Sequence, residues 1–134
     1  SFIMANVQVI QRHAHLASAV KLEFVTGREG RLAKATLTAI SNQYRGSGED
    51  REERAVAVQW TLWGKQAEHA AEYLGKGSHV NVVGRLHNTQ YQDGDGREVY
   101  GMAFTVEDID YLDSKAESEA RRVRTTQARQ PATA

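Results

Sequence analysis

The fold is decided by residues 63–86, which read WGKQAEHAAEYLGKGSHVNVVGRL. Apolar residues recur at helical spacing in the middle of this stretch, at Ala67, Ala70, Ala71 and Leu74. Glycines close off the segments on either side, because glycine adopts backbone angles that other residues avoid. The stretch therefore predicts a strand, one short helix and a second strand. A single helix set between strands is typical of a small barrel.

Alternation of apolar and polar residues, the pattern of a strand with one buried face, continues on both sides of this stretch. It occurs in two pieces within residues 6–24, and again at residues 33–39, 56–62 and near 97–106. Successive side chains of a strand point to opposite faces. Because Trp60 has the phase of the apolar Val58 and Leu62, we predict that Trp60 is buried and that Trp63 is exposed.

Turn and loop compositions separate these strands. The sequences TGREG at 26–30 and DGDG at 93–96 predict tight turns, the second of them a strong β-hairpin signal. Residues 41–54 contain no apolar side chain except Tyr44, so we expect a mobile loop that projects from the barrel. Ile109 and Leu112 are expected to complete the core.

The chain of 134 residues has no net charge, but its charges are distributed unevenly. Residues 1–113 contain 12 Lys and Arg against 15 Asp and Glu, whereas residues 114–134 contain five against two. The second segment is small and polar, with no apolar stripe to hold it to a core. We expect one domain over residues 4–113, followed by a basic, disordered tail over residues 114–134.

Composition also excludes several classes of protein. The absence of cysteine rules out disulfides and thiolate metal sites, and it agrees with a reducing cytoplasm. No apolar run approaches the roughly 20 residues that a membrane span requires, and the N-terminus lacks the pattern of a secretory signal. We therefore expect a cytoplasmic protein that makes no membrane contact.

The sequence of residues 63–86 and its flanks resembles that of the bacterial single-stranded DNA-binding proteins. Short motifs recur in that family in the same order: an aromatic before Gly64-Lys65, then Ala71-Glu72-Tyr73-Leu74, Lys76-Gly77-Ser78, Gly84-Arg85-Leu86, an aromatic, and a Gly-Asp-Gly hairpin. The likeness covers roughly residues 6–113. It implies a mostly antiparallel five-stranded barrel of the oligonucleotide-binding (OB) type, with one helix between the third and fourth strands.

Three aromatic residues are candidates for stacking on unpaired bases. Trp63 and Tyr91 are opposite in phase to the buried residues of their strands, and the resemblance places both at base-stacking positions of the family. Tyr44 falls near a third such position. Single exposed aromatics are also common on strands without any binding role. A fourth platform is missing, because Ala57 and Val58 stand where the family usually has tryptophan and an interface histidine.

Five basic residues are candidates for contacts with phosphates: Lys34, Arg45, Lys65, Lys76 and Arg85. Lys65 and Lys76 match basic positions of the family, and the other three are placed by strand phase or loop position. A solvated surface charge is the alternative for each of them. Gln59 and Gln90 occupy places where the family often has Arg or Lys, so a reduced electrostatic footprint is expected.

Metal binding, cofactors and catalysis find little support. His13 and His15 would share a strand face, but a zinc site needs three or four ligands and the other histidines are scattered along the sequence. DGDG at 93–96 imitates the start of a calcium loop, yet Arg97 and Phe104 stand where oxygen ligands are required. No phosphate-binding glycine loop or nucleophile motif is present. We expect no metal, no cofactor and no enzymatic activity.

The function predicted is sequence-independent binding of single-stranded DNA in replication, recombination or repair. The resemblance implies a homo-oligomer, with a tetramer favoured and a dimer possible, and the edge strand near residues 6–11 could pair with a twin. The family usually ends in an acidic, hydrophobic tip that recruits other replication proteins, whereas this sequence has RQPATA at 129–134. We therefore do not expect that recruitment here. One hypothesis is a specialised paralogue from a mobile element. A replication-restart or protein-interaction accessory with weak nucleic-acid binding is the rival, and RNA is not excluded as the strand.

Overall fold

The computed structural model describes residues 6–114, 116–117, 119–121 and 123. Its elements follow one another as β1 (Val7–Leu16), β2 (Lys21–Gly27), β3 (Gly30–Arg45), the 3-10 turn η1 (Gly48–Asp50), β4 (Glu52–Trp63), α1 (Gly64–Tyr73), β5 (His79–Gln92) and β6 (Glu98–Tyr111). Among these described residues, no helix is long and apolar enough to cross a membrane.

The strands close into a ring in the order β1-β5-β6-β4-β3, and β3 pairs back to β1 through His15 opposite Ile40 and Leu16 opposite Ala39. Every neighbouring pair is antiparallel except β4 and β6. The strand β2 continues from β1 and pairs only with β3 within the described residues. Because β1 and β2 are two pieces of one strand, the ring has five members with α1 between the third and fourth, which confirms the predicted barrel.

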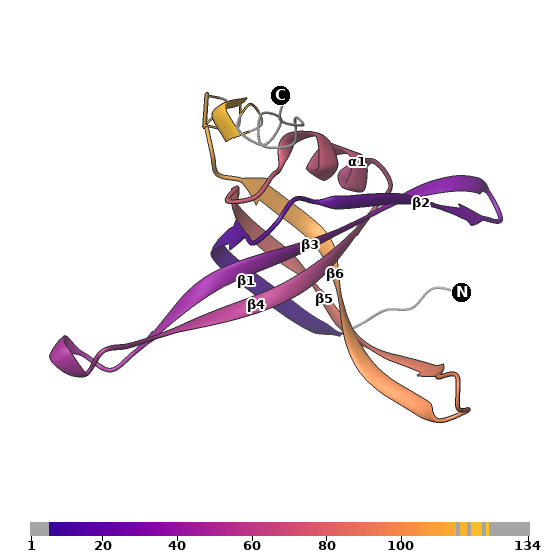
Figure 1. Ribbon diagram of the computed structural model, residues 1–134, viewed down its shortest axis with the longest axis horizontal. Helices are drawn as coiled ribbons and strands as arrows, with labels where there is room; N and C mark the ends of the chain where they lie inside the picture. Colours follow the sequence, from indigo (N-terminus) through magenta and orange to yellow (C-terminus); the bar gives the residue numbers. More distant parts are fainter. Residues whose placement is uncertain (1–5, 115, 118, 122, 124–134) are drawn as a thin grey trace, which may run out of the picture.

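Three hairpins extend beyond the ring as arms, formed by β2 with β3, β3 with β4, and β5 with β6 (Figure 1). The second arm corrects one expectation. Residues 41–54 are not a long loop, because β3 continues to Arg45 and β4 begins at Glu52, with these two residues paired. Two polar strands can keep their backbone hydrogen bonds to each other even where both faces of the hairpin meet water. The absence of apolar residues therefore did not mark the end of the strand.

The barrel interior is filled from five strands, β1, β3, β4, β5 and β6, and from the helix. Alternate residues 33–39 of β3, Trp60 and Leu62 of β4, and Val80 and Val82 of β5 are buried, as their phase predicts. Ala67 and Ala70 of α1 cover one end of this core. Ile109 packs against the core, but Leu112 is 38% exposed, so the expectation that it completes the core is wrong.

Buried polar groups inside the barrel are satisfied. The indole Nε1–H of Trp60 donates to Gln11 Oε1 at 2.8 Å, and Gln11 Nε2 donates to the Ala39 carbonyl at 3.0 Å. This amide joins β1, β3 and β4 in the centre of the core. A buried polar side chain that is fully paired favours one strand register over others, because a shift would leave its hydrogen bonds unmade.

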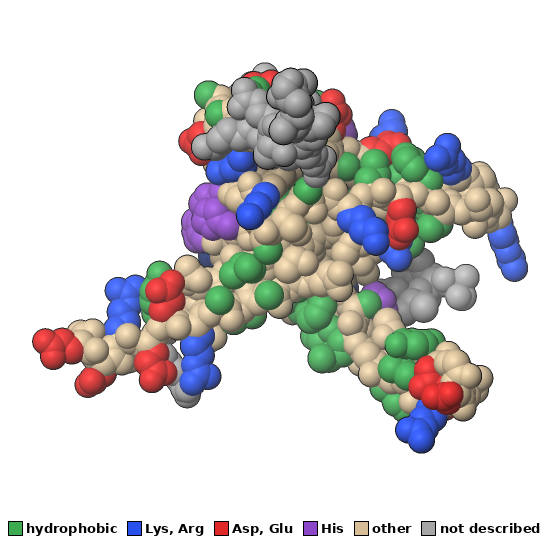
Figure 2. Space-filling view, viewed as in Figure 1, with side chains coloured by type: hydrophobic (Ala, Val, Ile, Leu, Met, Phe, Trp, Pro, Cys, Tyr) green, Lys and Arg blue, Asp and Glu red, His purple; other side chains and the backbone are tan. Residues whose placement is uncertain are grey.

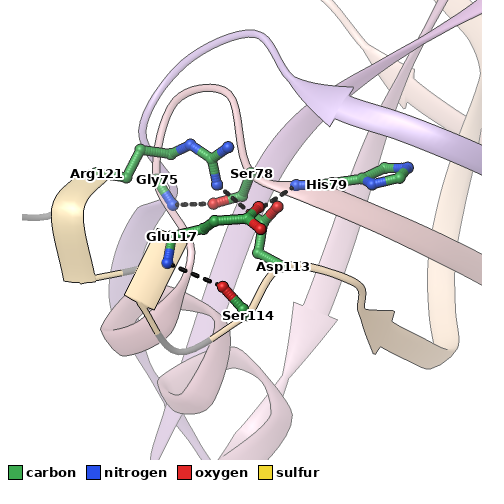
Figure 3. A network of polar contacts seen from close by, with 7 residues as sticks. All are labelled: Gly75, Ser78, His79, Asp113, Ser114, Glu117 and Arg121. Atoms are coloured by element: carbon green, nitrogen blue, oxygen red, sulfur yellow. Dashed lines mark hydrogen bonds and ion pairs between the residues drawn. The ribbon is translucent and has the colours of Figure 1, made fainter.

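A polar network joins the end of β6 to the start of β5 (Figure 3). The carboxylate of Asp113 accepts a hydrogen bond of 3.0 Å from the His79 backbone N–H and forms an ion pair with Arg121. Burial opposes ionisation of Asp113, but the hydrogen bonds from His79 and Arg121 outweigh it and hold the pKa of Asp113 below its ordinary value. The Glu117 N–H donates to Ser114 Oγ at 3.1 Å.

This network bears on the segment predicted to be a disordered tail. The described residues 116–117, 119–121 and 123 are helical, and the contact of Arg121 with Asp113 ties them to the barrel. Residues 115, 118, 122 and 124–134, the rest of the predicted tail, lie outside the described residues.

Candidate nucleic-acid interface

The candidate interface is centred on Trp63, the last residue of β4. Its side chain is 40% exposed on the outer face of the barrel, whereas Trp60 is fully buried, so both orientations predicted from strand phase are confirmed. Gly64 follows with a φ of +64°, a left-handed conformation that favours glycine and turns the chain from strand into helix. The short Trp-Gly-Lys sequence thereby holds an exposed ring at the entrance to α1.

A row of outer-face residues crosses three strands at this position. Lys34 of β3 lies directly opposite Trp63, and its Nζ is 5.6 Å from the centroid of the indole ring. Glu23 of β2 lies on the other side of Lys34, with its Oε1 3.7 Å from the same Nζ. A cation close to an exposed ring can meet a phosphate while the ring stacks on the adjoining base.

A second row lies two residues back along β4. Thr61 pairs with Thr105 of β6, and Thr105 pairs with Arg85 of β5. Neighbouring strands are about 5 Å apart, so Arg85 lies about 10 Å across the sheet from the strand that carries Trp63. The guanidinium Nε of Arg85 forms an ion pair with Glu107 Oε1. Lys65, the second residue of α1, is exposed two residues beyond Trp63.

The remaining candidates lie farther away. Tyr91 is 59% exposed, six residues beyond Arg85 along β5, which is about 20 Å of extended strand. Tyr44 is 52% exposed and lies ten residues beyond Lys34 along β3, about 33 Å away. Arg45 follows as the last residue of β3. Lys76 is exposed beyond the other end of α1, about 15 Å from Lys65.

Four of the eight candidates therefore form one loose cluster: Lys34 lies beside Trp63, Lys65 follows Trp63 by two residues, and Arg85 lies about 10 Å across the sheet. Two aromatics, Tyr44 and Tyr91, stand on separate arms and share the outward strand phase of this cluster. Only a ligand several nucleotides long could touch them and Trp63 together.

Sequence reasoning missed several neighbours of these residues. The Arg51 guanidinium lies 3.9 Å from the centroid of the Tyr44 ring, and Arg31 lies 4.3 Å from that of Phe24. Phe24 is 44% exposed because β2 extends past the covered part of the barrel, although its alternation predicted a buried face. The carboxylates beside Lys34 and Arg85 were also missed. All of these contacts depend on strand register, which the isolated sequence does not state.

Three histidines gather where the end of β1 meets the start of β5, and Figure 2 shows one large patch of histidine side chains as well as histidine atoms elsewhere on the same face. His13 Nδ1 lies 3.3 Å from His79 Nε2, and the His15 ring stacks on His79 with 4.5 Å between centroids. Burial, followed by the charges of His15 and His13, lowers the pKa of His79. His79 is more than 60 residues from His13 and His15 in the sequence, so the sequence did not predict that the three lie together. Within the described part of the chain, no group of three or more His, Asp or Glu is arranged to hold a metal ion.

Comparison with known proteins gives a consistent set of similarities. A model of the "Single-strand binding protein family" matches residues 14–112. Single-stranded DNA-binding protein 3 of Listeria innocua is 36% identical over 84 residues, which cover 63% of this chain and 52% of that protein. Single-stranded DNA-binding protein 1 of Clostridium acetobutylicum is 36% identical over 80 residues, covering 60% of this chain and 71% of that protein.

The single-stranded DNA-binding protein of Lactiplantibacillus plantarum is 36% identical over 91 residues, 67% of this chain and 44% of that protein. The chain thus spans about half the length of two of these three relatives.

Proposed function

Because the chain belongs to the single-strand binding protein family, whose members bind DNA and are not enzymes, we propose that it binds single-stranded DNA without reading base sequence. The observation that carries this proposal is an exposed indole on the outer barrel face with Lys34, Lys65 and Arg85 around it. Each unpaired base offers a flat face to Trp63, so the stacking contact is independent of base identity.

The cations around Trp63 supply the second half of the interaction. Neutralising phosphates releases counterions from the nucleic acid, so affinity falls as salt rises. The domain as a whole is mildly acidic, so a polyanion must be held by a local group of cations rather than by net charge. A strand that follows the outer face could continue to Tyr91 on one arm, or toward Tyr44 and Arg45 on another, with Lys76 as a further phosphate contact.

A homo-oligomer is part of the proposal, with a tetramer favoured over a dimer. In the described residues, β1 pairs with β5 from Val7 onward but meets β3 only at His15 and Leu16. The other edge of its first half is open, with Val7 54% and Ile10 53% exposed nearby. An open strand edge with apolar side chains is suited to pairing with a second copy.

The test is a titration of the full chain with a dT oligonucleotide, followed by tryptophan fluorescence and by anisotropy of a labelled strand. Stacking on Trp63 should quench fluorescence, and Trp63→Ala should remove the quenching and weaken binding by about 1 to 3 kcal/mol. Trp63→Phe is the matched control, because it keeps a ring for stacking. Parallel titration with an rU oligonucleotide compares RNA with DNA, and solution mass gives the oligomeric state.

One observation favours a second candidate, a protein-interaction or replication-restart accessory with weak nucleic-acid binding. Ala57 is exposed on the outer face of β4, opposite Ile40, and offers no ring where family members usually have one. Absence of quenching and of anisotropy change at low salt would favour this accessory role over the first proposal.

A further inference from the structure

We propose that Glu23 and Glu107 are affinity-limiting residues that compete with nucleic-acid phosphates for Lys34 and Arg85, two cations of the candidate interface. The inference rests on the proposed function and deepens it, because it names the groups that set how tightly this face holds a strand. Glu23 pairs with Lys34 and Glu107 pairs with Arg85. A phosphate must displace a carboxylate before it can reach either cation.

The first pair is fixed by strand register. Glu23 and Lys34 are directly opposed on β2 and β3, with 3.7 Å between Oε1 and Nζ. Their side chains are 49% and 33% exposed, so an incoming phosphate can approach the ammonium. Trp63 lies on the opposite side of Lys34, so a phosphate next to a base stacked on Trp63 would compete with the Glu23 carboxylate for the same ammonium.

The second pair is fixed by an irregularity in the β5–β6 ladder. Gly84 pairs with Val106 and Val83 pairs with Asp108, so Glu107 is an extra residue on β6. The Glu107 backbone carbonyl also accepts a hydrogen bond of 3.2 Å from Gln66 Nε2 of α1. These contacts hold Glu107 beside Arg85, with side chains that are 43% and 38% exposed.

Lys65, the third cation of the site, differs from Lys34 and Arg85. Within the described residues, Lys65 forms no ion pair, so it is available to phosphate directly. An exposed ion pair is weak, so a strand can displace it. Displacement still leaves a carboxylate close to a phosphate, and juxtaposed like charges oppose association. Both effects lower affinity without changing the stacking platform.

The experiment measures binding of a labelled dT oligonucleotide by Glu23→Gln and Glu107→Gln at several salt concentrations. Each substitution should tighten binding roughly two- to fivefold, the range expected for freeing one exposed ion pair. Each should also steepen the dependence of log affinity on log salt by about 0.7, because no displaced carboxylate then takes up a counterion to offset the one that the phosphate releases. Glu29→Gln, in the turn of the same β2–β3 hairpin, removes the same charge and should change neither quantity appreciably.

A double-substitution comparison separates competition from general electrostatics. Glu23→Gln should have no effect beyond the Glu29→Gln control in a Lys34→Gln background, and Glu107→Gln should likewise lose its effect with Arg85→Gln. Persistence of the effect without the cation would overturn the proposal, as would weaker binding by either single variant. If the unmodified chain binds and both Gln variants match it, only this inference fails. If neither the unmodified chain nor the variants bind, the proposed function fails as well.

Discussion

Gly84 of β5 lies beneath the indole of Trp60, at a distance that leaves no room for a side chain. A Cβ at position 84 would come within 2.6 Å of Trp60 Cζ3 and 2.1 Å of the Thr105 carbonyl oxygen. The largest buried side chain of the barrel therefore fits only because its neighbour has none. The same close approach brings β6 against β5 and places Thr105 between Thr61 and Arg85 on the outer face.

Gly84→Ala is expected to destabilise the barrel by about 1 to 3 kcal/mol or more, since the added methyl meets backbone as well as the indole. Urea unfolding followed by far-ultraviolet circular dichroism measures the change. Gly94→Ala is the matched control, because a Cβ at position 94 would meet nothing within 4 Å. Equal stability of the two variants would contradict the packing described for Gly84.

Gln11→Leu should lower the free energy of unfolding by about 1 to 3 kcal/mol, because it leaves the buried Nε1–H of Trp60 without an acceptor. The same unfolding experiment applies, and a shift in Trp60 emission would report the lost hydrogen bond. Gln8→Leu, an exposed position on the same strand, should cause a much smaller change. A Gln11→Leu barrel as stable as the unmodified one would argue against the role given to this amide.

The lowered pKa of His79 predicts a pH dependence of stability. Because folding favours the neutral imidazole, the unfolded chain binds more protons than the folded one between the folded pKa and the ordinary value of 6.5. Stability from this group is complete above pH 6.5 and decreases as pH falls toward the lowered folded pKa.

The groups facing His79 are His13 and His15, whose charges lower its pKa, and Asp113 and Glu117, whose charges raise it. His79→Asn should flatten the thermal stability profile between pH 7 and 5. An unchanged slope in that variant would show that other groups carry the dependence.

Asp113→Asn should loosen the helical residues that follow β6 while leaving DNA binding through Trp63 unchanged. The substitution removes the charge that pairs with Arg121 and weakens acceptance from the His79 N–H. Hydrogen exchange measured by mass spectrometry should become faster in peptides that cover residues 116–123. Unchanged protection in these peptides would show that other contacts hold the segment.

Lys65→Gln should weaken binding of a dT oligonucleotide and reduce the slope of log affinity against log salt by about 0.7, since one phosphate contact is lost. Arg28→Gln, in the β2–β3 turn, is a matched control that removes one charge away from the cluster. Titration by anisotropy at four or five salt concentrations measures both quantities. Equal slopes for the two variants would remove Lys65 from the interface.

The sequence was informative wherever a feature depends on neighbours along the chain. Strand phase alone distinguished the buried Trp60 from the exposed Trp63. Glycines marked the ends of the helix that connects β4 to β5. The exposed position of Tyr91 followed in the same way, although its role in binding remains a prediction. Residues 41–54 were the exception, because a polar composition is shared by loops and by ribbons that are solvated on both faces.

What the sequence alone determined is the barrel class, the placement of its one connecting helix, and the side of the sheet on which Lys34, Trp63, Arg85 and Tyr91 lie. These follow from local periodicity and backbone preference. Only the tertiary structure decided that Glu23 stands beside Lys34, that Glu107 holds Arg85, and that Gly84 admits Trp60. Such contacts join residues from separate strands, and their partners are set by register and ring closure, which no local pattern specifies.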